Sequence, residues 1–572
     1  MKFLSFLFLL FLVVTVNAQT KQTWITNIDI INTSTGKVIP GQTVVIEDST
    51  IRQIMKAGAK IKIPDSATVI NGTGKYIMPG LIDAHIHFFQ SGGLYTRPDA
   101  LDLMKIYSYE KDQQWIWENQ DELMRRYLVC GITTVIDVGG PFSNYEVRKK
   151  NAANTLSPNA YVTGPLISTY LPKNLDEKDP PIIKVNTEEE ARELVRKQLP
   201  YKPDFIKIWY IVLPGQPAEK TLSIVKATIE ESHKYSLKVA VHATEYETAK
   251  LAVNAGCDIL VHSVDDKVLD PLFLQLLKTK KVTYIPTAIV ASKYDETFTQ
   301  QHRISLHEQQ YANPFMLGTL FDLQHIPVKD VGFDYKKLRT RLLVPSKEDS
   351  TILQNLNIIN HAGINISAGT DAGNIGTQHG ASFYTEMLAM KQAGMNNAEI
   401  LRSATINTAI GFGKESEVGS IEKSKLANML ILNKNPLDSL GAVNDAVYII
   451  NRGKIIKKDT LLLITPESLV QQQVNAYNLN DPEAFLVPYS DSIEAFIFPH
   501  KKLLNGKKGL MEMYKEKFDN MPLSHMQILD RIKEDNIVID KTTDQSGITS
   551  TILYTIENNK IRKIYFIYKG SK

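Results

Sequence analysis

Four histidines stand at the ends of apolar segments. His85 and His87 close the run GLIDAHIH, His242 closes KVAVH and His262 closes DILVH. In a strand, side chains two positions apart point to the same face, so His85 and His87 could approach one metal ion from adjacent directions. The alternative is that each imidazole is a buried ring with its own hydrogen-bond partner. Four histidines that end three segments favour a metal site.

Two further polar residues interrupt or follow apolar segments. Lys207 lies within DFIKIWYI, where a charged ammonium is costly unless it is paired or neutral. It could reach the strand end or pair with a carboxylate, or it could be neutral, add carbon dioxide and become a carbamate. Asp371 follows INISAGT and precedes Ala372 and Gly373. It could be a turn residue, or it could ligate a metal and accept a proton.

The elements that must position these residues alternate in type between residues 76 and 411. The segments predicted as strands are 82–89, 133–138, 205–211, 239–242, 259–262, 283–286 and 364–368. Amphipathic helical segments separate them, which predicts a parallel sheet closed into a (β/α)₈ barrel. The strand ends then converge on one face. Tyr210 and His379 are candidate substrate contacts near that face, although His379 could serve only to position a helix that begins near residue 381.

The remaining segments predict smaller units. Residues 19–75 and 412–460 have short β-like runs and are expected to pair into one composite β-sandwich. The irregular stretch 268–345 is expected to be an insertion over the barrel mouth. Residues 465–572 begin with a helical pattern and end in alternating strands, which predicts a separate α+β unit.

The first residues have the pattern of a secretory signal. Met1 and Lys2 precede an apolar run, 3–16, that is too short to span a bilayer, and Asn17-Ala18 provides a small-residue cleavage site. We expect residues 1–18 to be removed after Ala18, which predicts a secreted or periplasmic protein without a stable membrane span; an uncleaved anchor is the alternative.

Composition excludes several classes of partner and site. The chain has 572 residues, with 65 Lys and Arg against 62 Asp and Glu, so its formal charge of +3 offers no footprint for nucleic acid. Its two cysteines, Cys130 and Cys257, are too few for a thiolate metal cluster. A small-molecule substrate is therefore expected as the partner. We also expect a homo-oligomer.

The motifs together resemble those of the amidohydrolase superfamily. The carrying runs are PGLIDAHIH (79–87), GITTV (131–135), AGCD (255–258), GTDAG (369–373) and ATINTA (404–409), together with the Lys207 segment and His242. The resemblance spans about residues 22–458 and is nearest to imidazolonepropionase-related and prolidase-like hydrolases. It implies that His85, His87 and Asp371 bind one divalent ion, expected to be zinc. It also implies that His242 and His262 bind a second zinc and that carboxylated Lys207 bridges the pair.

The resemblance implies hydrolysis of an amide-type C–N bond by a hydroxide that bridges the two ions, with Asp371 moving the proton. A dipeptide or an N-acyl amino acid is the expected substrate. A lactone, a cyclic amide or a phosphoester could use the same site, and a deaminase is a weaker alternative because its relatives do not need Lys207. A non-catalytic scaffold is the alternative from another class, but all six ligand positions are filled.

The tail resembles a SnoaL-like domain of the nuclear-transport-factor-2 fold. The resemblance covers about residues 468–567 and is carried by YNLND (477–481), FIFP (496–499) and LNGK (504–507). This fold serves enzymes, binding modules and dimerisation modules alike, so it assigns no function by itself. If the barrel were a scaffold, the tail would be the binding module that it displays.

Overall fold

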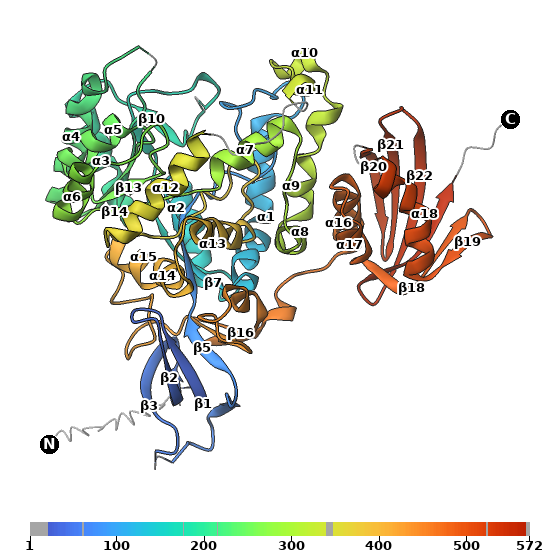
Figure 1. Ribbon diagram of the computed structural model, residues 1–572, viewed down its shortest axis with the longest axis horizontal. Coiled ribbons are helices and arrows are strands. Elements are labelled where there is room, and N and C mark those ends of the chain that lie inside the picture. Colours follow the sequence, from blue (N-terminus) through green and yellow to red (C-terminus); the bar gives the residue numbers. More distant parts are fainter. Residues whose placement is uncertain are drawn as a thin grey trace, which may run out of the picture.

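The computed structural model describes residues 21–59, 62–175, 177–213, 215–338, 347–521 and 524–567. The predicted signal segment lies outside these residues. Figure 1 shows a central body of strands and helices, a β-rich lobe below it and a C-terminal unit beside it. Within the described ranges, no helix combines the length and apolar character that a bilayer crossing requires.

The central body contains a closed ring of parallel strands. The named strands of the ring are β6 (Leu81–Ile86), β7 (Ile132–Asp137), β8 (Asn159–Val162), β11 (Ile206–Trp209), β12 (Val239–His242), β13 (Ile259–Val261) and β14 (Thr283–Ile285). Residues 364–368 complete the ring, because Tyr284 N donates to Asn365 O and Ala84 N donates to Ala368 O, both at 2.8 Å. The Asp204 N to Val162 O bond, at 2.9 Å, joins β8 to the approach of β11. The expected barrel of mixed α and β elements is therefore confirmed.

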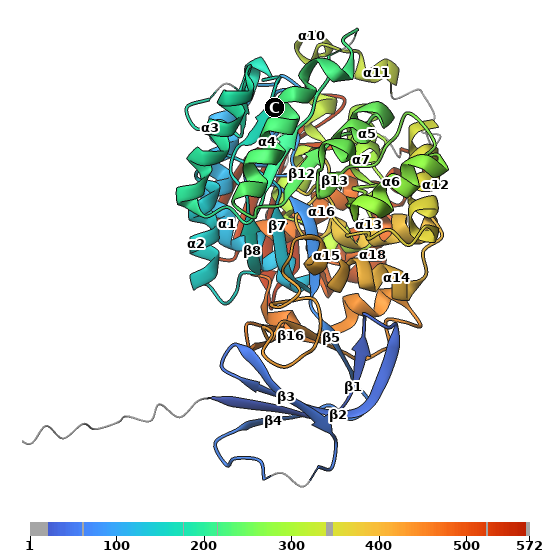
Figure 2. The same cartoon turned by 90° about the vertical axis from the view of Figure 1, so that its left-hand side faces the viewer.

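Helices surround this ring on its outer side (Figure 2). They include α1 (Tyr109–Val129), α2 (Asn144–Ala153), α3 (Glu188–Gln198), α4 (Leu222–Lys234), α5 (Tyr246–Ala255), α6 (Pro271–Lys280) and α12 (Lys347–His361). Local sequence explains their ends. The Thr187 side chain accepts from Glu190 N at the start of α3, and Gly256 adopts a left-handed φ of 100° where α5 stops.

Two insertions interrupt the barrel pattern. The first adds β9 (Leu166–Ser168), η1 (Lys173–Leu175) and β10 (Ile182–Lys184) between β8 and α3, and β9 pairs with β11. The second follows β14 and contains α7 (Val290–Thr299), α8 (Leu306–Tyr311), α9 (Pro314–Thr319), η4 (Asp322–His325), α10 (Val328–Val331) and α11 (Tyr335–Leu338). It begins later than the expected residue 268 because Asp270 caps α6, so that 271–285 still form a barrel helix and strand.

The β-rich lobe is built from both flanks of the barrel. Its eight strands are β1 (Gln22–Asn32), β2 (Lys37–Glu47), β3 (Thr50–Lys56), β4 (Thr68–Asn71), β5 (Tyr76–Pro79), β15 (Met429–Leu432), β16 (Ala446–Asn451) and β17 (Lys454–Lys457). Strand β5 pairs parallel to β1 and antiparallel to β15. The two flanks therefore join in one hydrogen-bonded sheet, which folds back so that β3 lies beside residues 424–427, and buried residues of both flanks share one hydrophobic core.

The C-terminal unit has one six-stranded sheet and three helices. The helices are α16 (Pro466–Asn478), α17 (Pro482–Leu486) and α18 (Gly506–Asn520), and the sheet order is β19-β18-β23-β22-β21-β20. These strands span β18 (Tyr489–Ile497), β19 (Lys501–Asn505), β20 (Met526–Glu534), β21 (Ile537–Asp544), β22 (Thr549–Glu557) and β23 (Lys560–Ile567). Buried Phe485, Tyr489 and Tyr554 are part of its own hydrophobic core. Helix α16 packs against α9 of the barrel insertion, where Asn475 Nδ2 donates to Pro314 O at 2.7 Å.

Candidate metal centre

Strand β6 and the segment after residue 368 hold three candidate ligands together. Every residue of β6 is buried, and the Asp371 N–H donates to His85 O at 2.8 Å. Buried Asp83 fixes the two segments, because its carboxylate accepts from the Thr370 hydroxyl at 2.7 Å and from the Thr370 and His85 N–H groups. The ligand positions are therefore set by backbone pairing between distant parts of the sequence.

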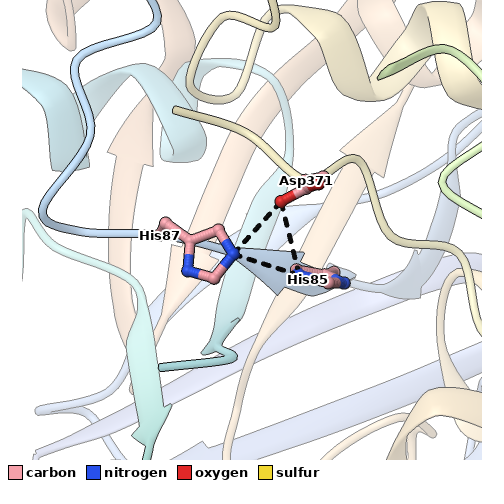
Figure 3. A group of neighbouring side chains, drawn as sticks. All are labelled: His85, His87 and Asp371. Carbon is pink, nitrogen blue, oxygen red and sulfur yellow. Dashed lines mark hydrogen bonds and ion pairs between the residues drawn. The ribbon is translucent and has the colours of Figure 1, made fainter. Parts of the chain in front are cut away.

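Figure 3 shows His85, His87 and Asp371 directed toward one another. The two Nε2 atoms are 3.2 Å apart, and Asp371 Oδ1 is 3.3 Å from that of His85 and 3.2 Å from that of His87. Ligand atoms arranged tetrahedrally about 2.0–2.2 Å from one zinc-type ion are about 3.3–3.6 Å apart. The spacing and the donor types of this group therefore fit a divalent metal ion.

A backbone carbonyl defines the protonation of one ligand. His87 Nδ1 lies 2.7 Å from Gly139 O. A carbonyl oxygen can only accept, so Nδ1 carries a hydrogen, and the tautomer of the neutral ring is the one whose Nε2 lone pair can bind a metal ion. Gly139 is held in turn by Asp137, whose Oδ1 accepts from Gly139 N at 3.0 Å.

The other two histidines lie beside this group. The ring centroids of His242 and His262 are 4.4 Å apart, and those of His85 and His262 are 4.9 Å apart. His262 Nδ1 is 2.8 Å from the Thr287 hydroxyl and 3.9 Å from Asp371 Oδ2. Burial lowers the pKa of His85, His242 and His262 well below the usual value, which leaves their rings neutral and able to bind a cation.

Lys207 projects into the same cavity from β11. The residue is 1% exposed, and no described residue offers a hydrogen-bond partner to its Nζ. Burial lowers the pKa of this amine to about 7, and the charge of Asp371 opposes that shift. A buried primary amine without a partner, among imidazoles, fits a site where the nitrogen is neutral and open to modification.

The structure places all six predicted ligands on one cavity of about 330 Å³. It places the two predicted substrate contacts elsewhere. Tyr210, three positions after Lys207, donates its hydroxyl to Ala218 O and does not line this cavity. His379 is also outside the lining, and its Nε2 and Nδ1 lie 2.7 Å from Gln90 O and the Tyr127 hydroxyl, respectively.

Other residues reach the cavity without having been selected from the sequence. Trp209, Arg97, Asn374 and Tyr294 all line it. Trp209 could have been found, because it lies two positions after Lys207 and so shares a strand face. The other three lie in loops or in the second insertion, where the sequence pattern gives no direction for a side chain.

The backbone around the site is strained. His262, Thr287 and Asp371 have φ values of 73°, 42° and 61°, in a region that non-glycine residues rarely occupy. Such conformations cost about 1–3 kcal/mol each and cluster at functional sites. Their presence at two predicted ligands and at the hydrogen-bond partner of His262 agrees with a site shaped for chemistry.

Known proteins resemble this chain to different extents. The protein-family model described as "Amidohydrolase family" matches residues 76–458 of this chain. An enamidase of Eubacterium barkeri is 27% identical over 212 residues, which are 36% of this chain and 45% of the enamidase. This chain therefore aligns with less than half of that protein. An imidazolonepropionase of Geobacillus kaustophilus is 23% identical over 426 residues, covering 69% of this chain and 84% of that protein.

A solved structure extends the likeness to the fold. A Xaa-Pro dipeptidase with methionine bound in its active site superposes with a TM-score of 0.59 at 22% identity, covering 76% of this chain and 100% of that chain. At this identity the likeness shows the fold alone. The family match covers well over half of the chain and includes every predicted metal ligand. The chain belongs to the amidohydrolase family of hydrolase enzymes.

Proposed function

We propose that this chain hydrolyses an amide-type C–N bond, with a dipeptide or an N-acyl amino acid as substrate and two zinc ions as cofactors. One observation carries the proposal. A single cavity collects four imidazoles, one carboxylate and one buried amine without a partner. A non-catalytic scaffold would have no use for that combination, which is costly to bury unless it binds something.

The residues divide into two groups of ligands. His85, His87 and Asp371 would hold one ion, and His242 and His262 would hold the second. The neutral Lys207 amine would form an N–C bond to carbon dioxide and release one proton, giving a carbamate whose two oxygens could bridge the ions. Bound divalent ions would lower the pKa of water and polarise the substrate carbonyl.

Asp371 would move the proton. Its Oδ1 faces His85 and His87, while its Oδ2 is left to accept a proton from the attacking water. The water oxygen bonds to the acyl carbon, the C–N bond breaks, and Asp371 passes the proton to the leaving nitrogen. The products are a carboxylic acid and an amine, and Asp371 returns to its ionised form.

Three proposals concern the rest of the chain. We propose that residues 1–18 direct the protein to a secreted or periplasmic location, which the amino-terminal sequence of the mature protein would test. We also propose that the C-terminal unit is SnoaL-like and that the protein forms a homo-oligomer. The order of three helices and a six-stranded sheet in the C-terminal unit supports the SnoaL-like assignment. Sedimentation analysis would test the homo-oligomer.

The proposed function predicts a defined metal content and a dependent activity. Purified protein should contain about two equivalents of zinc and hydrolyse members of a dipeptide and N-acyl amino acid panel. Lys207→Ala should lose at least one equivalent and nearly all activity, whereas Lys226→Ala, which changes an exposed lysine on α4, should lose neither. Native protein without metal would contradict the proposal, and so would cleavage of an added lactone or phosphoester when no member of the panel is cleaved.

A further inference from the structure

One wall of the cavity is apolar and comes from the first insertion. Leu166 lies on β9, Leu175 on η1 and Ile182 on β10, and their exposed fractions are 6%, 1% and 5%. They form one hydrophobic cluster with the half-buried Trp209, and all four line the cavity. Leu166, Leu175 and Ile182 thus add an apolar surface to the cavity from an insertion outside the regular strand and helix pattern of the barrel.

The apolar wall lies on the histidine side of the site. A Cβ placed on Gly139 would be 2.6 Å from Leu166 Cδ1, so Leu166 packs against the residue whose carbonyl accepts from His87. The Trp209 ring lies 6.1 Å from that of His242 in an edge-to-face arrangement. A group seated on this wall is therefore next to the predicted ligands of both ions.

A polar cluster lies on the Asp371 side. Asn374 Nδ2 donates to Asp371 O at 3.1 Å, and Asn374 Oδ1 accepts from Arg97 Nη1 at 2.5 Å and from the Tyr294 hydroxyl at 2.8 Å. Arg97 also donates through Nε and Nη2 to Asp99. The cavity thus has different chemistry on its two sides.

We propose that the preferred substrates are N-acyl amino acids with a large apolar acyl group, which the wall of Leu166, Leu175, Ile182 and Trp209 binds. This inference rests on the proposed function. Asp371 must reach the leaving nitrogen, so the amine half lies toward Asn374 and Arg97. The acyl half then extends away from Asp371 toward the wall, where burying each methylene group strengthens binding about fourfold.

Two substrates with the same amine half test the assignment. N-acetyl-L-alanine and N-(4-phenylbutanoyl)-L-alanine differ only in the group that should contact the wall. We expect kcat/KM to be about 100-fold higher for the phenylbutanoyl compound. Equal values for the two compounds, or a higher value for the acetyl compound, would overturn the proposal.

Substitutions in the wall should remove this preference selectively. Leu175→Ala should lower kcat/KM for the phenylbutanoyl substrate about tenfold and leave that for the acetyl substrate within about twofold. Ile182→Val, which removes one methylene equivalent, provides a milder second variant and should lower kcat/KM for the phenylbutanoyl substrate about fourfold. Leu272→Ala, at a 77% exposed position on α6, is the control and should change neither value. An equal loss for both substrates would contradict a role in specificity.

A binding measurement separates this inference from the proposed reaction. Titration calorimetry on chelator-treated protein should detect 4-phenylbutanoate, with affinity about tenfold lower in Leu175→Ala. If phenylbutanoate binds in this way but no N-acyl amino acid is hydrolysed, the proposed function fails and the apolar subsite stands. If amides are hydrolysed but phenylbutanoate binds no better than acetate, the subsite fails and the proposed function stands.

Discussion

At the scale of single residues, Lys207 links the acid–base chemistry of the site to its assembly. Burial lowers the pKa of its amine from 10.5 to about 7, so the amine is mostly charged at pH 6 and mostly neutral at pH 8. Only the neutral amine can add carbon dioxide. The direction of the shift therefore favours carbamate formation as the pH rises through 7.

This predicts a bicarbonate-dependent step in reconstitution. Metal-free protein given zinc and bicarbonate should recover activity to a greater extent at pH 8 than at pH 6, and removing bicarbonate should reduce recovery at pH 8. Zinc retention and activity after gel filtration measure this effect. Recovery that ignores bicarbonate at both pH values would contradict a carbamate on Lys207.

Asp137 is a second residue whose role can be tested, namely that of holding Gly139, whose carbonyl accepts from His87. Its carboxylate is fully buried and accepts from Gly139 N at 3.0 Å and from Asn144 Nδ2 at 2.6 Å. Asp137→Asn places an NH₂ group against one of these donors, which should displace Gly139 O from His87 Nδ1. We expect zinc affinity, measured by chelator competition, to fall about 10–100-fold.

Asp179→Asn is a matched control for this change. The exposed Asp179 also accepts from backbone N–H groups of the loop after β7, at Phe142 and Ser143, but it makes no bond toward His87. The Asp179→Asn protein should bind zinc with the same affinity as the unchanged protein. A folded Asp137→Asn protein with the same affinity as this control would show that Gly139 does not need Asp137 to orient His87.

At the scale of elements, the second insertion holds the loop that carries Arg97. Thr319 Oγ1, at the end of α9, accepts from Leu94 N at 3.0 Å, and the Tyr95 hydroxyl donates to Asp322 at 2.9 Å. These bonds join the loop after β6 to a segment more than 200 positions later in the sequence. Arg97 is thus positioned by the insertion as well as by its neighbours.

Thr319→Val tests this connection. Valine has nearly the same volume but cannot accept a hydrogen bond, so Leu94 N loses its partner at a cost of about 1 kcal/mol. If the cost is expressed in substrate binding, KM should rise about fivefold with kcat nearly unchanged. Thr299→Val, which removes an exposed hydroxyl bond on α7, is the control. Equal kinetic constants in the two variants would rule out a role of this bond in binding.

The sequence predicts elements and strand-end residues better than loop residues. His85, His87, Lys207 and His242 lie at or near the ends of regular strands, where alternation and barrel closure define a direction. Asn374 lies in a loop whose path depends on backbone contacts with residues that are distant in the sequence. The sequence also predicts that the two flanks pair, but not that β5 lies between β1 and β15, because registers between distant strands depend on packing.

At the scale of the whole molecule, the C-terminal unit contacts the barrel through the same insertion. Helix α16 packs on α9, and a Cβ on Gly318 would lie 2.6 Å from Gln471 Nε2 and 3.1 Å from Asn475 Oδ1. Gly318 immediately precedes Thr319, which holds the loop of Arg97. A series of contacts therefore runs from α16 through α9 to the cavity.

Gly318→Val should weaken the contact between the two units, because its side chain would displace the side-chain ends of Gln471 and Asn475. Helix α9 would then lose the support of α16, and the Thr319 to Leu94 bond would weaken. We expect faster proteolysis in the linker before α16, residues 461–465, and a KM raised by up to about fivefold, the value expected for Thr319→Val. Asn475→Ala, which removes the bond to Pro314 O, should give a smaller change in the same direction.

Lys515→Ala, on the exposed side of α18, is the control and should leave both the proteolysis rate and KM unchanged. If Gly318→Val accelerates proteolysis while KM stays constant, the C-terminal unit docks on the barrel without supporting substrate binding.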